Sequence, residues 1–104
     1  LIEACENGNE NIVKYLVENG ADINEKNKDD ETPIIVACKK GYEKIIKYLV
    51  EKGANIKIKN KPKKGEYYDE TPLIIACKNG HENIVKVLIK NGASISYPSE
   101  GGGT

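Results

Sequence analysis

Residues 71–93 read TPLIIACKNGHENIVKVLIKNGA, and the same order of residue types occurs twice more in the chain. Residues 32–54 read TPIIVACKKGYEKIIKYLVEKGA, and residues 1–21 read LIEACENGNENIVKYLVENGA. The cysteine of each copy moves from position 5 to 38 to 77, so the period is 33 residues and then 39. A unit that returns in phase predicts a repeat architecture, and it disfavours the alternative of an ordinary helical bundle.

Each copy predicts two short helices joined by a tight turn. Thr32 and Thr71 each precede a proline, which suits a helix start because Thr can cap the helix and Pro fits its first turn. Gly41 and Gly80 are expected to end that first helix. The second helix has an apolar stripe at helical spacing, with lysines and glutamates on its other side. In the middle copy the stripe consists of Ile45, Ile46, Leu49 and Val50.

The helix pairs are expected to stack on one another. A pair of this size cannot bury its apolar stripe alone, and Ala37, Cys38 and Cys77 are small enough to let the helices approach closely. After each Gly-Ala the pattern changes to alternation, as in residues 56–59, which is typical of an extended arm with one sheltered side. The residues therefore predict a solenoid of stacked helix pairs with extended links.

The composition bounds the classes of function. The chain has 104 residues, with no Phe, Trp or Met, so the core of the single domain must be aliphatic. Sixteen basic residues, all Lys, balance sixteen acidic ones. A net charge near zero argues against wholesale binding to nucleic acid or to an anionic membrane. No apolar run approaches the roughly 18 residues of a membrane span, so no membrane partner is expected.

Residues 71–81, followed by 84–93, resemble an ankyrin repeat, with the Thr-Pro-Leu opening and the Ala two residues after the usual His position. The resemblance covers residues 1 to about 97, and Ile35 and Ile74 replace the family's His. It implies an all-α repeat solenoid of ankyrin-type helix-turn-helix repeats with short β-hairpin loops. The expected divisions are a partial repeat at 1–31, repeats at 32–70 and 71–97, and a flexible tail or linker at 98–104.

No catalytic residue, metal or cofactor is predicted. Cys5, Cys38 and Cys77 are expected about 8–10 Å apart in successive repeats, too far for a disulfide or a shared zinc ion. We interpret them as small buried apolar side chains. Three free thiols favour a reducing compartment, so the expected location is intracellular and cytoplasmic. His81 is the only histidine, and because Asn9 and Tyr42 fill the equivalent places its role is interpreted as structural.

The arm after the second repeat is six residues longer than the arm after the first. Its Tyr67 and Tyr68 are adjacent, so in an extended chain one can face a partner as an anchor; alternatively both cover the base of the hairpin. Residues 57–64 carry alternating lysines. These would attract an acidic partner or a nucleic acid, or only guard an exposed edge, and the nearby acidic residues and the lack of Arg disfavour nucleic acid.

The resemblance implies a non-catalytic protein–protein interaction module that binds its partner on a concave face of hairpins and first-helix ends. Carried over position by position, the candidate protein-binding residues are Lys28, Asp29, Glu31, Lys39, Lys40, Tyr67, Tyr68, Lys78 and Asn79. Neither end has an evident polar cap, so further repeats or another chain are expected to cover Leu1 and Ile2 at one end and Val87 at the other. Glu3 is charged where the other copies are apolar, and it either lines the groove or meets water.

Overall fold

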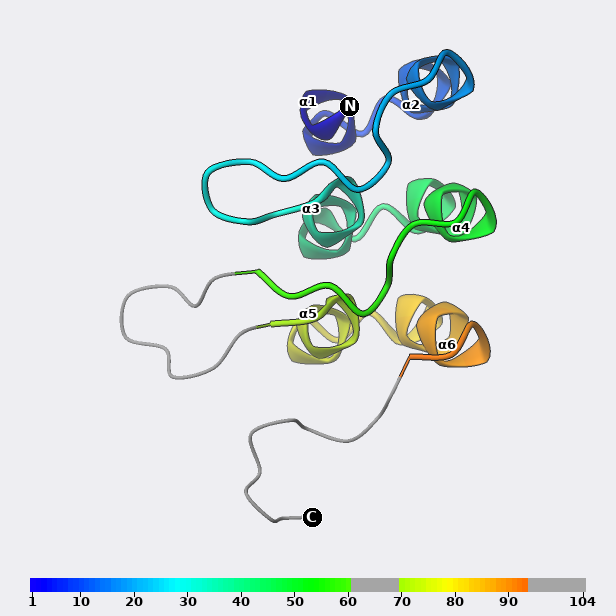
Figure 1. Cartoon of the computed structure of the whole chain (residues 1–104). Helices are drawn as coiled ribbons and strands as arrows, with labels where there is room; N and C mark the ends of the chain where they lie inside the picture. The colour runs from blue at the N-terminus through cyan, green and yellow to red at the C-terminus, as the bar shows by residue number, and fades with distance from the viewer. Residues whose placement is uncertain (61–69, 94–104) are drawn as a thin grey trace.

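The computed structural model describes residues 1–60 and 70–93, and six helices lie within them. They are α1 (Ile2–Glu6), α2 (Glu10–Glu18), α3 (Pro33–Lys40), α4 (Glu43–Glu51), α5 (Pro72–Lys78) and α6 (Glu82–Lys90). The short helices α1, α3 and α5, which we call the inner helices, stack in one layer. The outer helices α2, α4 and α6 stack beside them in a second layer (Figure 1). The expected all-α solenoid of stacked pairs is confirmed.

The hairpins of the expected fold contain no strand within the described residues. Asn60 and Glu70 form one isolated antiparallel bridge, and the equivalent loop between α2 and α3 is closed by turns. The expected tail at 98–104 lies outside the described residues.

The inner helices α3 and α5 begin as their sequences predict. The Thr32 and Thr71 side chains accept hydrogen bonds from the backbone N–H groups of Ile35 and Ile74, and a proline follows each threonine. These bonds satisfy donors that the first turn of a helix leaves open. The outer helices differ among themselves, because Asn9 caps α2 with its side chain whereas Tyr42 and His81 make no such bond.

Tyr42 and His81 instead pack against the glycine that follows the inner helix of the preceding repeat, which is Gly8 for Tyr42 and Gly41 for His81. A Cβ atom built on Gly41 would lie 2.8 Å from the His81 ring, and one on Gly8 would lie 2.8 Å from the Tyr42 ring. Both glycines also have a left-handed backbone, with φ of 77° at Gly41 and 70° at Gly8. Glycine is therefore required there twice, for its backbone and for its missing side chain.

Equivalent residues differ in burial according to which side of the stack they face. Ile45 and Ile84 are each 2 % exposed because they pack against the preceding pair, whereas Ile12 in the first pair is 47 % exposed. Cys5 and Cys38 are fully buried against the following pair, but Cys77 is exposed. The interpretation of all three cysteines as buried is therefore wrong for Cys77, since no further helix pair covers it in the described part of the chain.

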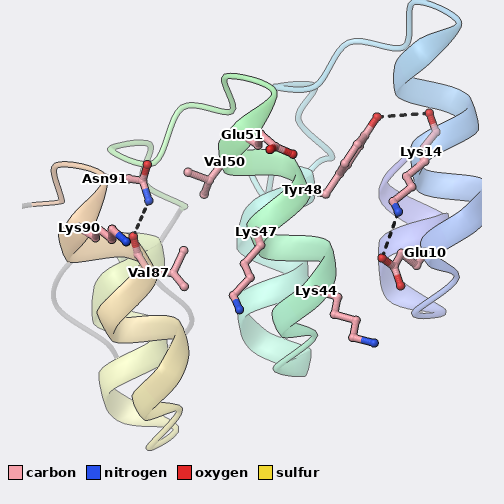
Figure 2. A pocket seen from close by; sticks show the side chains of 10 residues that line it. All are labelled: Glu10, Lys14, Lys44, Lys47, Tyr48, Val50, Glu51, Val87, Lys90 and Asn91. Carbon is pink, nitrogen blue, oxygen red and sulfur yellow. Dashed lines mark hydrogen bonds and ion pairs between the residues drawn. The ribbon is translucent and has the colours of Figure 1, made fainter.

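The large apolar side chains that are exposed at the two ends of the stack are not the ones that the sequence predicts. Tyr15 is 67 % exposed at one end and Ile89 is 43 % exposed at the other, whereas Leu1 and Ile2 are half-buried. Val87 is also half-buried, and it lies on the side of α6 that faces α4 (Figure 2). The expectation that Val87 belongs to the end face is therefore wrong. Glu3 is exposed to water.

We predict that Gly41→Ala destabilises the fold more than Gly80→Ala. Both glycines are left-handed, with φ of 77° and 71°, so each alanine costs about 1–2 kcal/mol of backbone energy. Only at Gly41 does the added methyl group meet a neighbour, the His81 ring, and displacing that ring costs roughly 1 kcal/mol more. Urea unfolding followed by far-ultraviolet circular dichroism gives both free energies of unfolding.

The His81→Ala background supplies the control for this comparison. Without the ring, the excess cost at Gly41 should vanish and the two alanines should become equally destabilising. An excess that persists in this background would show that the contact with His81 does not constrain Gly41.

We also predict that a thiol reagent at pH 8 labels Cys77 rapidly in the folded protein and labels Cys5 and Cys38 slowly. Burial raises the pKa of Cys38 to about 12. Burial, aided by the Glu25 carboxylate and opposed by the N-terminal ammonium group, raises the pKa of Cys5 to about 11. Because the thiolate is the reactive form, both buried thiols are nearly inert at this pH. Mass spectrometry of the labelled peptides measures the three rates.

The same shifts determine a pH dependence of stability. An exposed cysteine in the unfolded chain ionises near pH 8.5, below the folded values of Cys5 and Cys38. The stabilising effect of keeping these thiols protonated is full below pH 8.5 and is lost as the pH rises towards 11 and 12. A Cys38→Ala variant should lose less stability over this range than the parent. Equal labelling rates at the three cysteines would contradict both expectations.

Candidate functional site

The loop before α3 and the loop before α5 are each closed at the base by an asparagine and a glutamate. In the loop between α2 and α3, Asn27 N–H donates to the Glu31 carbonyl oxygen, and Glu31 N–H donates to Asn27 Oδ1, each at 3.0 Å. Asn60 and Glu70 make the same two bonds, also at 3.0 Å, before α5. We call this reciprocal pair the Asn–Glu clasp.

The Asn–Glu clasp shows where the extra residues of the longer arm lie. In the first loop the clasped residues are at positions 27 and 31, and in the second at 60 and 70, a difference that accounts for all six extra residues. The insertion therefore falls between Asn60 and Glu70, while the frame on either side keeps its geometry. Residues 61–69 lie outside the described residues, and with them the candidate anchors Tyr67 and Tyr68.

Each clasp glutamate is also joined to the last turn of the helix that follows it. The Lys39 ammonium group at the end of α3 pairs with Glu31, and Lys78 at the end of α5 pairs with Glu70. Glu31 and Glu70 are largely buried, so these pairs are screened less than fully exposed ones. The loop base and the far end of the inner helix are thus held together twice along the stack.

The remaining predicted residues lie on exposed parts of the same layer. Lys28 and Asp29 are exposed at the turn of the first loop, where Asp29 N–H donates to Asn27 Oδ1 at 2.9 Å. Lys40 is exposed at the end of α3, and Asn79 is exposed at the end of α5. The structure thus brings Glu31 together with Lys39. Among the described residues, no hydrogen bond or ion pair joins the loop turn to Lys40 or Asn79.

Sequence reasoning missed the residues that fix this surface. Asn27 and Asn60 were not singled out, although they occupy equivalent positions before a glutamate and a Thr-Pro, which is the signal that marks them. Asn24 was also missed, and its Oδ1 accepts the Asn55 N–H at 2.9 Å, tying one arm to the next. This last bond connects residues 31 positions apart, which is beyond the reach of local pattern analysis.

The candidate metal ligands of the described residues do not come together in a site. Within residues 1–60 and 70–93, no three His, Cys, Asp or Glu side chains gather closely enough to hold a metal ion. His81 Nδ1 is buried and has no hydrogen-bond partner there, and the ring serves the contact with Gly41. In the same part of the chain, none of the helices is long and apolar enough to cross a membrane.

A comparison with protein families agrees with this geometry. The sequence model described as ankyrin repeats, in three copies, matches residues 1–99. No curated protein matches the chain closely enough to be compared with it. Ankyrin repeats are in general protein–protein interaction modules and not enzymes. The match spans nearly the whole chain and coincides with the three stacked helix pairs, so the chain belongs to the ankyrin-repeat family.

Proposed function

We propose that this chain is a non-catalytic scaffold that binds a partner protein on the face formed by its loops and the ends of its inner helices. The observation that carries the proposal is the repeated union of the Asn–Glu clasp with the Glu–Lys ion pair. It holds each loop base against its helix, so that the base of the loop and the end of the helix keep fixed relative positions.

The proposed division of labour follows from burial. Glu31, Lys39 and Lys78 are engaged in ion pairs, and we assign them to positioning the loops. Lys28, Asp29, Lys40 and Asn79 are exposed, and we assign them to contact with the partner. Because the frame is ordered before binding, little conformational entropy is lost when the partner docks.

The longer second loop extends the same proposal. Its Tyr67 and Tyr68 stand in the sequence between the two residues of a clasp, and the clasp glutamate Glu70 pairs with Lys78 at the end of α5. Tyrosine is a frequent anchor at interfaces because it combines a large apolar area with a polar tip. We propose that one of these tyrosines is the anchor of the complex.

A second candidate function is binding of an acidic partner, or of nucleic acid, through the lysine-rich arm 57–64. The observation that favours it is the alternation of exposure along the arm, where Lys57 and Lys59 are exposed while Ile56 and Ile58 are half-buried. Lysines that share one edge raise the local positive potential. The arm's later lysines lie outside the described residues.

The side chains exposed at the two ends of the stack support the proposal that other repeats or another chain pack there. Ile12, Tyr15 and Ile89 are large and exposed, and we propose that further repeats or another chain cover them.

The three cysteines are free, which favours a reducing, intracellular and cytoplasmic location. The proposed repeat boundaries remain 1–31, 32–70 and 71–97.

We predict that a photocrosslinking amino acid placed at Lys40 or Asn79 captures the same partner from an extract of the source cell. The same group at Lys86 should not capture it, because this exposed lysine belongs to α6, which lies in the second layer of the stack (Figure 1). Once the partner is identified, Lys40→Glu should weaken its affinity by about fivefold or more, since it reverses an exposed charge at the centre of the face. Titration calorimetry measures the affinity.

Tyr67→Ala and Tyr68→Ala, made separately, test the anchor in the same assay, where the anchor residue should cost at least about tenfold in affinity. Unchanged affinity in both tyrosine variants would remove the anchor. Unchanged affinity in Lys40→Glu as well would move the binding face away from the loops and the inner-helix ends.

For the second candidate function, we predict that association with an oligonucleotide, if it occurs through the arm, falls steeply with salt concentration because counterions are released. The double substitution of Lys57 and Lys59 by Glu should then abolish it, whereas Lys86→Glu should not. Fluorescence anisotropy with a labelled single-stranded oligonucleotide at low salt is the measurement. A flat titration at low salt removes nucleic acid from consideration.

A further inference from the structure

The outer helices α2, α4 and α6 share a groove of about 510 Å³ on the side of the molecule formed by their exposed faces. We call it the outer groove, and its defining residues are Lys44, Lys47, Val50, Val87 and Lys90 (Figure 2). It lies on the second layer of the stack, away from the loops, so it is independent of the face proposed above.

The wall of the outer groove that contains Tyr48 shows how an aromatic ring fits between two neighbouring outer helices. The Tyr48 ring leans towards α2, and its hydroxyl donates to the Lys14 carbonyl oxygen at 3.5 Å. The ammonium groups of Lys14 and Lys52 lie 5.8 Å and 5.7 Å from the centre of the ring, within the range of cation–π attraction. Tyr48 is only 9 % exposed, so the ring fills the space between α2 and α4.

One step further along the stack the same space is left unfilled. Val87 stands at the position equivalent to Tyr48, and Lys47 stands at the position equivalent to Lys14. Val50 and Val87 point towards each other between α4 and α6, and both are half-buried (Figure 2). The outer groove is therefore open where the repeat would otherwise place an aromatic ring, and it keeps the apolar floor and the lysine that such a ring contacts.

The charge around this opening is also a departure from the repeat. Lys44 replaces the asparagine of the other two copies, and Lys90 replaces a glutamate. Four lysines line the outer groove against two glutamates. Lys14 pairs with Glu10 and Lys47 with Glu43, whereas Lys44 and Lys90 form no ion pair with the residues that the structure describes. Lys90 thus adds positive charge beside Val50 and Val87, and Lys44 adds it at the other end of the outer groove, on the side of α4 that faces α2 (Figure 2).

We propose that the outer groove binds an acidic peptide segment of a partner protein, with one aromatic side chain of that segment inserted beside Val87. The ring takes the place that Tyr48 fills one step before, against Val50 and under the Lys47 ammonium group. Carboxylates on either side of the aromatic residue pair with Lys44 and Lys90. Apolar insertion fixes the position of the segment, and the lysines select its charge.

The test uses the folded 104-residue chain, labelled with ¹⁵N and titrated with the peptide acetyl-Glu-Glu-Tyr-Glu-Glu-amide. We expect saturable shifts of the backbone amide signals of Val50, Val87 and Lys90 at millimolar peptide or below. The matched peptide with Ala in place of Tyr should bind at least about tenfold more weakly, and the peptide with Lys in place of Glu should not bind.

Variants of the protein separate the ring from the charge. Val87→Tyr supplies the missing ring from the chain itself and should weaken binding of the tyrosine peptide at least about tenfold. Because it restores the residue type that the other two repeats carry, a thermal melt should show no loss of folding. Lys90→Glu should weaken binding by about fivefold, whereas the matched Lys86→Glu on the same helix, outside the groove, should change it less than about twofold.

Three outcomes would overturn the proposal. They are the absence of saturable shifts at millimolar peptide, full affinity in Val87→Tyr, and shifts centred on Lys40 and Asn79 instead of the outer groove. Lys40→Glu distinguishes this proposal from the function proposed above, because it should leave binding of the peptide in the outer groove unchanged while it weakens the partner of the loop face.

Discussion

The whole arrangement depends on the burial of aliphatic side chains between successive helix pairs. A pair of helices of five to nine residues has too little interior of its own, so each pair uses the next as the other half of its core. The burial of equivalent residues makes this visible, since Ile45 and Ile84 are enclosed by a preceding pair and Cys5 and Cys38 by a following one. The hydrogen bonds and ion pairs of the loops are added at the edge of this apolar contact.

The loops are attached to this core by polar bonds that the core does not need for its own packing. The Asn–Glu clasp and the Glu–Lys ion pair recur with the same partners in both loops, although one loop is six residues longer than the other. Loop length and frame geometry are therefore uncoupled. This separation is how a scaffold of nearly identical repeats presents different side chains at each step.

Local sequence rules predict the frame well and the site only in part. The threonine caps, the glycine ends and the apolar stripe of α4 follow from short-range chemistry, and the structure has each where the pattern indicates it. The bond between Asn24 and Asn55, the His81 contact with Gly41 and the open space at Val87 depend on which surfaces meet in the stack. Such contacts become visible in the sequence only when the repeats are superposed and their differences are examined residue by residue.

The clasp at Asn60 and Glu70 has a consequence for how such a chain can diversify. The same two bonds close a loop with three intervening residues at Asn27 and Glu31 and one with nine at Asn60 and Glu70, so the clasp accommodates loops of different length. The entropic cost of closing a longer ring grows only with the logarithm of its length. New recognition sequences can therefore be inserted between Asn60 and Glu70, in evolution or by design, without a change in the helical stack.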